Sequence, residues 1–249
     1  MNKLLLLTLA LTLLPLSAFA ETPPKALVIT GGHGFDDAPF DAMLKALPGM
    51  ECTRIDVKDD GSIFEKLPEG KWDVIVLYNM GQKISDKSRE NFLALLDRGV
   101  GLVVMHHAIA AFNDWPEYWK IIGAHYFLKD YTEKGSEHAQ STWKEGLEYT
   151  LTPAEKDHPI LKGVMPFTVH DETYKGFTTA PDNHTLLTTE GPTTQPEYAW
   201  SRTYKNANVV YMLPGHGPTI FADENYRKVV GQAILWAAKP AKDGVSAIK

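Results

Sequence analysis

The stretch Gly101-Leu102-Val103-Val104-Met105-His106-His107 decides which fold we expect for this chain. A short apolar run without polar alternation is typical of a parallel strand that is buried on both faces. This run leads directly into two histidines. We therefore expect a sharp turn at His106, at the carboxyl end of a central strand, where many α/β enzymes present a catalytic side chain.

Similar runs before this stretch predict the order of the elements. Residues 26–30 and 73–78 indicate buried strands, and residues 52–57 alternate as a strand does. A helix with Ser85 as its N-cap is expected to end at Gly99. Strand, helix and strand in this order imply right-handed parallel crossovers. The predicted fold class is α/β: a single domain with a doubly wound, mostly parallel sheet and helices on both faces, as in flavodoxin-like proteins.

The pattern becomes less regular after Asp114. An aromatic and polar segment up to residue 142 is expected to lie over the sheet as an insertion, not as a separate domain. An amphipathic helix over residues 225–238 closes the chain. Between the insertion and this helix, strand-like segments span residues 147–151, 185–188, 198–203 and 209–212.

The first twenty residues have the pattern of a secretory signal peptide. Lys3 precedes an apolar run from Leu4 to Leu14, and the small-residue signature Ala18-Phe19-Ala20 follows. The run is too short to span a bilayer, and no later segment is apolar enough to anchor the chain. We expect the mature protein in the periplasm, without a membrane span. The expected parts are a signal peptide (1–20), one domain (21–240) and a flexible tail (241–249).

Composition and motifs argue against several classes of partner. The formal charge is −6, and it becomes −7 without Lys3, the one charged residue among the first twenty, so a nucleic acid partner is not expected. The sequence Gly31-Gly32-His33-Gly34 lacks the full Gly-x-Gly-x-x-Gly pattern, so a nicotinamide cofactor is not expected either. The single cysteine, Cys52, is expected to be a small buried residue of a strand.

Histidines follow three of the expected strands. Ligands of open parallel sheets bind beyond the carboxyl ends of the strands. His33 comes after the first strand, His106 and His107 after the central strand, and His216 after the last one. A single histidine in such a place is consistent with a hydrogen-bonded, partly buried residue, whereas three segments together predict a pocket.

The chemistry expected in this pocket is proton transfer. The imidazole of His106 can move protons near neutral pH, and a carboxylate of Asp171 or Glu172 could orient it or act as general base. The alternative is that residues 171–172 form a solvated turn. The candidate catalytic residues are His106, Glu172, Asp171 and His216. The candidate substrate-binding residues are Gly32, His33, Phe35, His107, Trp115, Tyr174 and Trp200, with the aromatic ones stacking against a ring-shaped ligand.

A divalent metal is a further possibility for these side chains. Several imidazoles and carboxylates could converge, in which case we expect His33, His106 or His216 among the ligands. However, the chain has neither a His-Glu-x-x-His motif nor paired cysteines, so no metal is indicated by spacing.

The motifs taken together resemble the ThuA-like (trehalose utilisation) family, in order from about Lys25 to Ala238. The resemblance implies a fold similar to class I glutamine amidotransferases, without their cysteine nucleophile, because the elbow position is occupied by His106. It also implies a role in carbohydrate metabolism, including trehalose and oxidised keto-sugars. The motifs are Gly31-Gly32-His33, residues 101–108, Asp114-Trp115-Pro116-Glu117-Tyr118 with Gly123, Asp157-His158-Pro159-Ile160, Asp171-Glu172-Thr173-Tyr174, Tyr198-Ala199-Trp200 and Gly215-His216.

These observations lead to one expected function and two alternatives. We expect an exported protein that binds a small carbohydrate and acts on a glycoside or keto-sugar by histidine and carboxylate acid-base chemistry, as a lyase, hydrolase or isomerase. The alternatives are a non-catalytic sugar-binding or accessory protein and a metal-dependent hydrolase. The sequence leaves the oligomeric state open.

The signal-peptide pattern predicts that the mature chain begins at Glu21. Intact-mass measurement of the protein recovered from the periplasm or medium of an expressing bacterium checks this. A chain that is recovered only from the cytoplasm, with Met1 to Ala20 still attached, would contradict it.

Overall fold

The structure is a computed structural model that describes residues 22–58, 61–68, 71–133 and 135–241. The expected signal peptide and all but the first residue of the expected tail lie outside these residues. The first half of the fold comprises β1 (Lys25–Gly31), α1 (Asp37–Ala46), β2 (Glu51–Asp56), β3 (Val74–Asn79), α2 (Asp86–Asp97), β4 (Gly101–Met105), α3 (Pro116–Ile122), β5 (Ala124–His125), β6 (Tyr131–Glu133) and β7 (Ser136–His138). The second half comprises β8 (Thr142–Pro153), β9 (Phe167–Lys175), β10 (Thr178–Thr179), β11 (His184–Thr188), β12 (Glu197–Tyr204), β13 (Ala207–Met212), α4 (Pro218–Ala222) and α5 (Glu224–Ala237).

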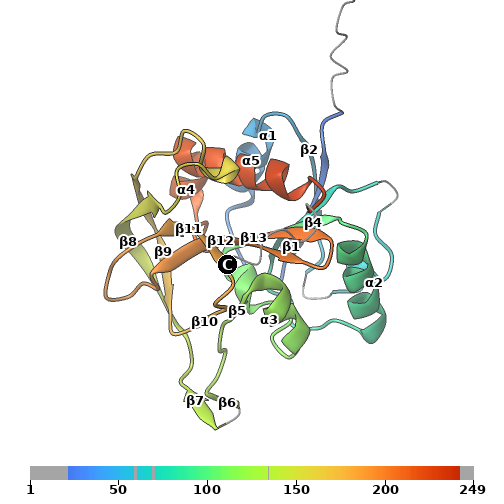
Figure 1. Cartoon of the computed structure of the whole chain (residues 1–249), viewed down its shortest axis with the longest axis horizontal. Helices are drawn as coiled ribbons and strands as arrows, with labels where there is room; N and C mark the ends of the chain where they lie inside the picture. Colours follow the sequence, from blue (N-terminus) through green and yellow to red (C-terminus); the bar gives the residue numbers. More distant parts are fainter. Residues whose placement is uncertain (1–21, 59–60, 69–70, 134, 242–249) are drawn as a thin grey trace, which may run out of the picture.

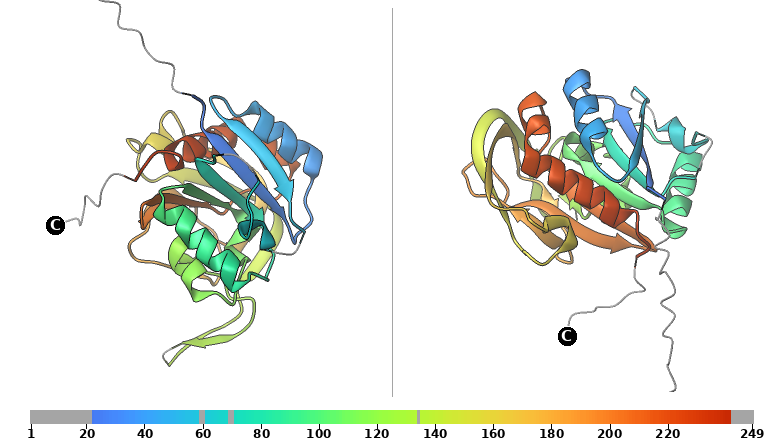
Figure 2. Two further views of the ribbon diagram at one scale, coloured as in Figure 1. Left: turned by 90° about the vertical axis from the view of Figure 1, so that its right-hand side faces the viewer. Right: turned by 90° about the horizontal axis from the view of Figure 1, so that it is seen from above.

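The described residues form a nine-stranded sheet in the order β2-β1-β3-β4-β13-β12-β11-β8-β9. The strands from β2 to β13 pair in parallel, and those from β13 to β9 pair in antiparallel fashion. Helices α1, α4 and α5 cover one face of the parallel part, and α2 and α3 cover the other (Figures 1 and 2). The expected single α/β domain is therefore confirmed.

The central strands are apolar because helices cover both of their faces. All residues of β3, β4 and β13 are buried.

Helix α2 begins where expected, since the hydroxyl of Ser85 accepts a hydrogen bond from the amide of Ser88. Among the described residues, no helix is both long and apolar enough to span a bilayer.

The antiparallel half bends back toward the carboxyl ends of the parallel strands. Strand β9 contacts α4, and the carboxylate of Asp171 on β9 accepts hydrogen bonds from the loop that follows β13. Asp171 and Glu172 therefore belong to a buried strand, and the alternative of a solvated turn is wrong. The expected insertion contains the short hairpin β6–β7, which extends away from the body of the protein (Figure 1).

The packing of α5 on β4 predicts the effect of Gly101→Ala. A Cβ atom at position 101 would lie 2.1 Å from the carbonyl oxygen of Ala237, so the helix would have to shift away from the strand. We expect a loss of about 1–3 kcal/mol in the free energy of unfolding, measured by urea denaturation. Gly34→Ala is the matched control, because a Cβ atom at position 34 would have no other atom within 4 Å, and stability should be unchanged. Equal midpoints for both variants would contradict this close contact.

Candidate functional site

Three loops at the carboxyl ends of the parallel strands bring their histidines together. His33 follows β1, His106 and His107 follow β4, and His216 follows β13. The rings of His33 and His107 stack with centroids 4.3 Å apart, and those of His106 and His216 lie 5.2 Å apart. The expected convergence of the three segments is thus present in the fold.

His106 is held in an uncommon backbone conformation. It is the first residue of the short 3-10 helix η2 (His106–Ala110), and its φ is +51°, in the left-handed region that non-glycine residues rarely adopt. Its side chain is completely buried, and Nδ1 lies 2.7 Å from the carbonyl oxygen of Leu213. Because a carbonyl oxygen only accepts, Nδ1 carries the hydrogen, and Nε2 is left to face the site.

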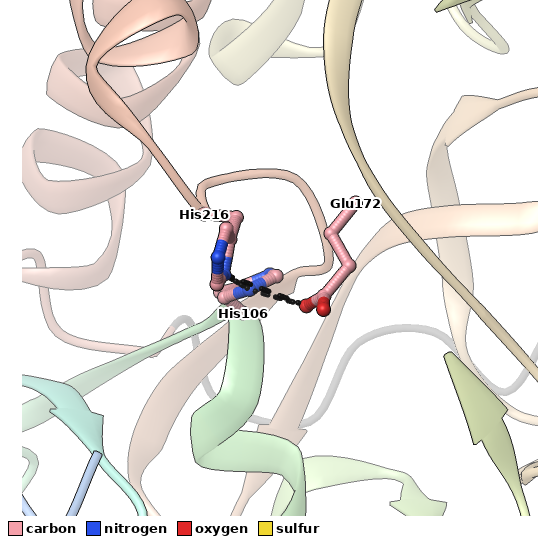
Figure 3. Close-up of side chains that lie close together, drawn as sticks. All are labelled: His106, Glu172 and His216. Carbon is pink, nitrogen blue, oxygen red and sulfur yellow. Dashed lines mark hydrogen bonds and ion pairs between the residues drawn. The ribbon is translucent and has the colours of Figure 1, made fainter. Parts of the chain in front are cut away.

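Three polar atoms surround Nε2 of His106. Glu172 Oε2 lies at 3.0 Å, the Tyr174 hydroxyl at 3.1 Å and His216 Nδ1 at 3.1 Å (Figure 3 shows the two histidines and Glu172). In a neutral imidazole with the hydrogen on Nδ1, Nε2 presents a lone pair. A lone pair and a carboxylate repel each other at 3.0 Å, so a proton or another cation must lie between them.

The surroundings determine which groups are charged. Burial acts to raise the pKa of Glu172, but the hydrogen bond and charge of His106, together with His216, outweigh it, and the net pKa is lowered. Burial and the charge of Glu172 raise the pKa of Tyr174 well above its usual value. Glu172 is therefore a carboxylate at neutral pH, and Tyr174 stays a neutral proton donor.

His33 and His107 form a neutral imidazole stack. Burial lowers the pKa of both, that of His107 strongly. Nε2 of His107 donates to the carbonyl oxygen of Tyr78, at 3.3 Å, and its Nδ1 has no hydrogen-bond partner among the described residues. Nδ1 of His33 donates to the carbonyl oxygen of Gly34 at 2.7 Å. Both rings thus have an unprotonated nitrogen; that of the partly exposed His33 can accept a hydrogen bond from a ligand hydroxyl, whereas Nδ1 of His107 is buried.

Asp171 positions the loop that carries His216. Its two carboxylate oxygens accept the backbone N–H groups of Gly215 and His216 at 2.7 and 2.9 Å. Gly215 itself has φ +138°, and a Cβ atom there would lie 2.4 Å from the Tyr226 hydroxyl. The carboxylate of Asp171 is therefore engaged with the backbone, whereas that of its neighbour Glu172 faces His106.

A pocket of about 180 Å³ opens over this cluster. Trp143, Tyr126 and Tyr174 form its aromatic walls, and Trp143 is 59% exposed. The remaining residues that line it are His33, Met80, His107, Ile109, Ala110, Glu145, Glu172 and His216.

The structure places four of the expected substrate-binding residues outside this lining. Trp200 is completely buried and donates its indole N–H to the carbonyl oxygen of Ile122. Trp115 packs in the core, where its ring stacks on Tyr118. The prediction that these two tryptophans form pocket walls is therefore wrong. Large aromatic side chains stabilise a fold most when they are buried, and both tryptophans are part of the core.

The other two residues support the site from behind. Phe35 packs edge-on against Tyr78. Gly32 has φ +72°, and a Cβ atom there would lie 2.7 Å from the amide nitrogen of Gly81, so this loop needs a glycine. Sequence reasoning missed Tyr126, Trp143 and Glu145, whose positions depend on how the insertion and β8 fold over the sheet.

The order of the strands separates the thiol of Cys52 from the cluster of histidines and carboxylates. It lies on β2 at the edge of the sheet, and burial raises its pKa to about 11. A thiol with so high a pKa is a poor nucleophile at neutral pH.

The fold and the elbow define a class: an α/β protein with a doubly wound, largely parallel sheet in which a histidine occupies the turn after the central strand. The family model described as trehalose utilisation (ThuA) matches residues 25–237. The chain therefore belongs to the ThuA family, and this membership supports a role in carbohydrate utilisation in general.

Solved structures agree with this fold. A ThuA-like protein from Parabacteroides merdae is 20% identical with a TM-score of 0.70, over 87% of this chain and 90% of that chain. A ThuA-like protein from Bacteroides uniformis is 21% identical with a TM-score of 0.63, over 88% of this chain and 93% of that chain. PurLQS from Thermotoga maritima is 15% identical with a TM-score of 0.54, over 87% of this chain and 100% of that chain. No curated protein matches the chain in sequence.

The contacts of Asp171 predict the effect of Asp171→Asn. An amide has one accepting oxygen, so one of the two backbone N–H groups would face an NH₂ group instead. We expect the free energy of unfolding to fall by about 1–3 kcal/mol, measured by urea denaturation. Asp157→Asn, at an exposed position, is the control and should leave stability unchanged. Equal stability of both variants would show that Asp171 does not hold this loop.

Proposed function

We propose that this protein is an exported carbohydrate-processing protein that acts on a sugar or keto-sugar by proton transfer, with His106 and Glu172 as the central pair. The observation that carries the proposal is the 3.0 Å contact between His106 Nε2 and Glu172 Oε2: Glu172 lines the pocket, and the fully buried His106 lies behind it. Export to the periplasm remains part of the proposal and rests on the pattern of residues 1–20.

The charge states of the site suit a substrate with a carbonyl group. A keto group acidifies the adjacent C–H, and a buried carboxylate paired with an imidazole can accept that proton. The hydroxyl of Tyr174, which lines the pocket and stays protonated, can donate a hydrogen bond to the oxygen on which negative charge develops. Loss of a leaving group, return of the proton elsewhere or attack by water would then make the protein a lyase, an isomerase or a hydrolase.

The pocket suits a small sugar. Its volume of about 180 Å³ is below the range of roughly 300–1,000 Å³ of drug-sized sites, which favours one sugar ring over a polymer. Trp143 and Tyr126 offer apolar faces for the C–H groups of such a ring, and the unprotonated nitrogen of His33 can accept from one of its hydroxyls.

The proposal predicts that His106 and Glu172 act as one unit. Removal of a positioned proton-transfer group typically costs about 10²–10⁴-fold in rate, and we expect this loss for His106→Asn and for Glu172→Gln. Asparagine is chosen because it tolerates the positive φ of position 106. The double variant should lose little more than the worse single variant.

The measurement is a screen of oxidised and unoxidised glycosides for turnover, followed by rate and binding constants for each variant. Glu148→Gln, an exposed carboxylate on the adjacent strand β8, is the matched control and should keep full activity. Sugar binding without any conversion would favour the accessory-protein alternative. Full activity of both single variants would show that the chemistry takes place elsewhere.

A further inference from the structure

Three side chains at the base of the pocket place their polar atoms around one point. His106 Nε2 and Glu172 Oε2 are 3.0 Å apart, His106 Nε2 and His216 Nδ1 are 3.1 Å apart, and His216 Nδ1 and Glu172 Oε2 are 3.6 Å apart. The side chains come from η2, β9 and the loop after β13, and they point toward one another (Figure 3). We propose that these three atoms are ligands of one divalent transition-metal ion.

The separations match those of ligands around a metal. Bonds of about 2.1 Å to nitrogen and oxygen give neighbouring ligands a separation of about 3.0 Å in octahedral geometry and about 3.4 Å in tetrahedral geometry. Two of the observed distances, 3.0 and 3.1 Å, agree with octahedral geometry, and the third, 3.6 Å, is slightly longer than the tetrahedral value. The three atoms therefore form one face of a coordination sphere.

Hydrogen bonds among the three side chains explain these short distances less well than a bound metal ion does. The hydrogen of His106 is on Nδ1, bound to Leu213, so Nε2 presents a lone pair; the Tyr174 hydroxyl can donate to it, but the carboxylate of Glu172 still faces it at 3.0 Å. If His216 Nδ1 carries a hydrogen, it can donate it to Nε2 of His106 or to the carboxylate of Glu172, but not to both at full strength. One cation attracts all three lone pairs at once.

The surroundings of the three ligands are those of a metal site. Metal-binding histidines usually donate their second N–H to a carbonyl or carboxylate, which orients the ring. His106 donates to the Leu213 carbonyl at 2.7 Å; Glu145 Oε1 lies 3.9 Å from His216 Nε2, which is within ion-pair distance but too long for a hydrogen bond. The backbone of His216 is held by Asp171.

The ligand types indicate the class of metal. Two imidazoles and one carboxylate suit Mn²⁺, Fe²⁺, Co²⁺, Ni²⁺ or Zn²⁺ better than Ca²⁺ or Mg²⁺, which prefer oxygen ligands. Three protein ligands leave coordination positions open, and Glu172 and His216 both line the pocket. A water molecule or the oxygens of a sugar could occupy these positions.

The role of the ion, unlike its binding, rests on the proposed function. A bound ion would polarise the carbonyl of a keto-sugar, because it acts as a Lewis acid. The carboxylate of Glu172, bound through Oε2, would keep its second oxygen to accept the proton. His106, buried behind the pocket, would then hold the ion in position.

The test uses the mature protein without a histidine tag, treated with a chelator and then titrated with Zn²⁺, Mn²⁺ or Co²⁺. Isothermal titration calorimetry should give one site per chain, and the Co²⁺ form should show a visible absorption band. His216→Ala and Glu172→Gln should each weaken binding by about 100-fold or more, because each removes one of three ligands. The ion should raise the Tm of the wild type but not of these variants.

His158→Ala is the matched control, because His158 lies beside His184 in another histidine pair and should leave metal affinity unchanged. Absence of binding at micromolar metal, or equal affinity in wild type and His216→Ala, would overturn the inference. Turnover by the metal-free protein would overturn the role of the ion while leaving the proposed function intact. One bound ion without any turnover would support the site and count against the function.

Discussion

One buried hydrogen bond organises the site: Nδ1 of His106 donates to the carbonyl oxygen of Leu213 at 2.7 Å. It joins the end of β4 to the end of β13, which are neighbours in the sheet. The bond assigns the hydrogen of the imidazole to Nδ1 and directs Nε2 toward Glu172, Tyr174 and His216. The left-handed backbone of His106 is tolerated because this bond and complete burial hold the ring in place.

The parallel and antiparallel halves of the sheet supply different side chains to the site around this hydrogen bond. The parallel half presents histidines at the carboxyl ends of its strands, as open α/β sheets present ligand-binding groups. The antiparallel half folds back and supplies the carboxylates and the phenol from β9. Asp171 and Glu172 are consecutive, so they point to opposite sides of the strand. One carboxylate therefore holds the loop of His216, and the other faces the pocket.

The site combines a buried base with a neutral acid. Glu172 has a lowered pKa because two histidines lie beside it, and Tyr174 has a raised pKa because it is buried next to that carboxylate. At the same pH, the carboxylate stays charged and can accept a proton, while the phenol stays neutral and can donate a hydrogen bond. The two histidines that pair with Glu172 are also the ones that a metal ion would bridge, so proton chemistry and metal binding share the same atoms.

The local pattern of the sequence determined the parallel core and the elbow. Residues 101–107 indicated a buried strand that ends at His106, and the histidines after three strands indicated a pocket, because strand burial and strand ends depend on short-range sequence. Tertiary structure alone decided which aromatic residues face the pocket. Trp115 and Trp200 are as aromatic as Trp143, but helix packing buries the first two, and the fold of β8 leaves the third exposed. It also decided that Asp171 binds backbone and Glu172 binds His106, since a contact between residues 66 positions apart depends on how distant strands pair.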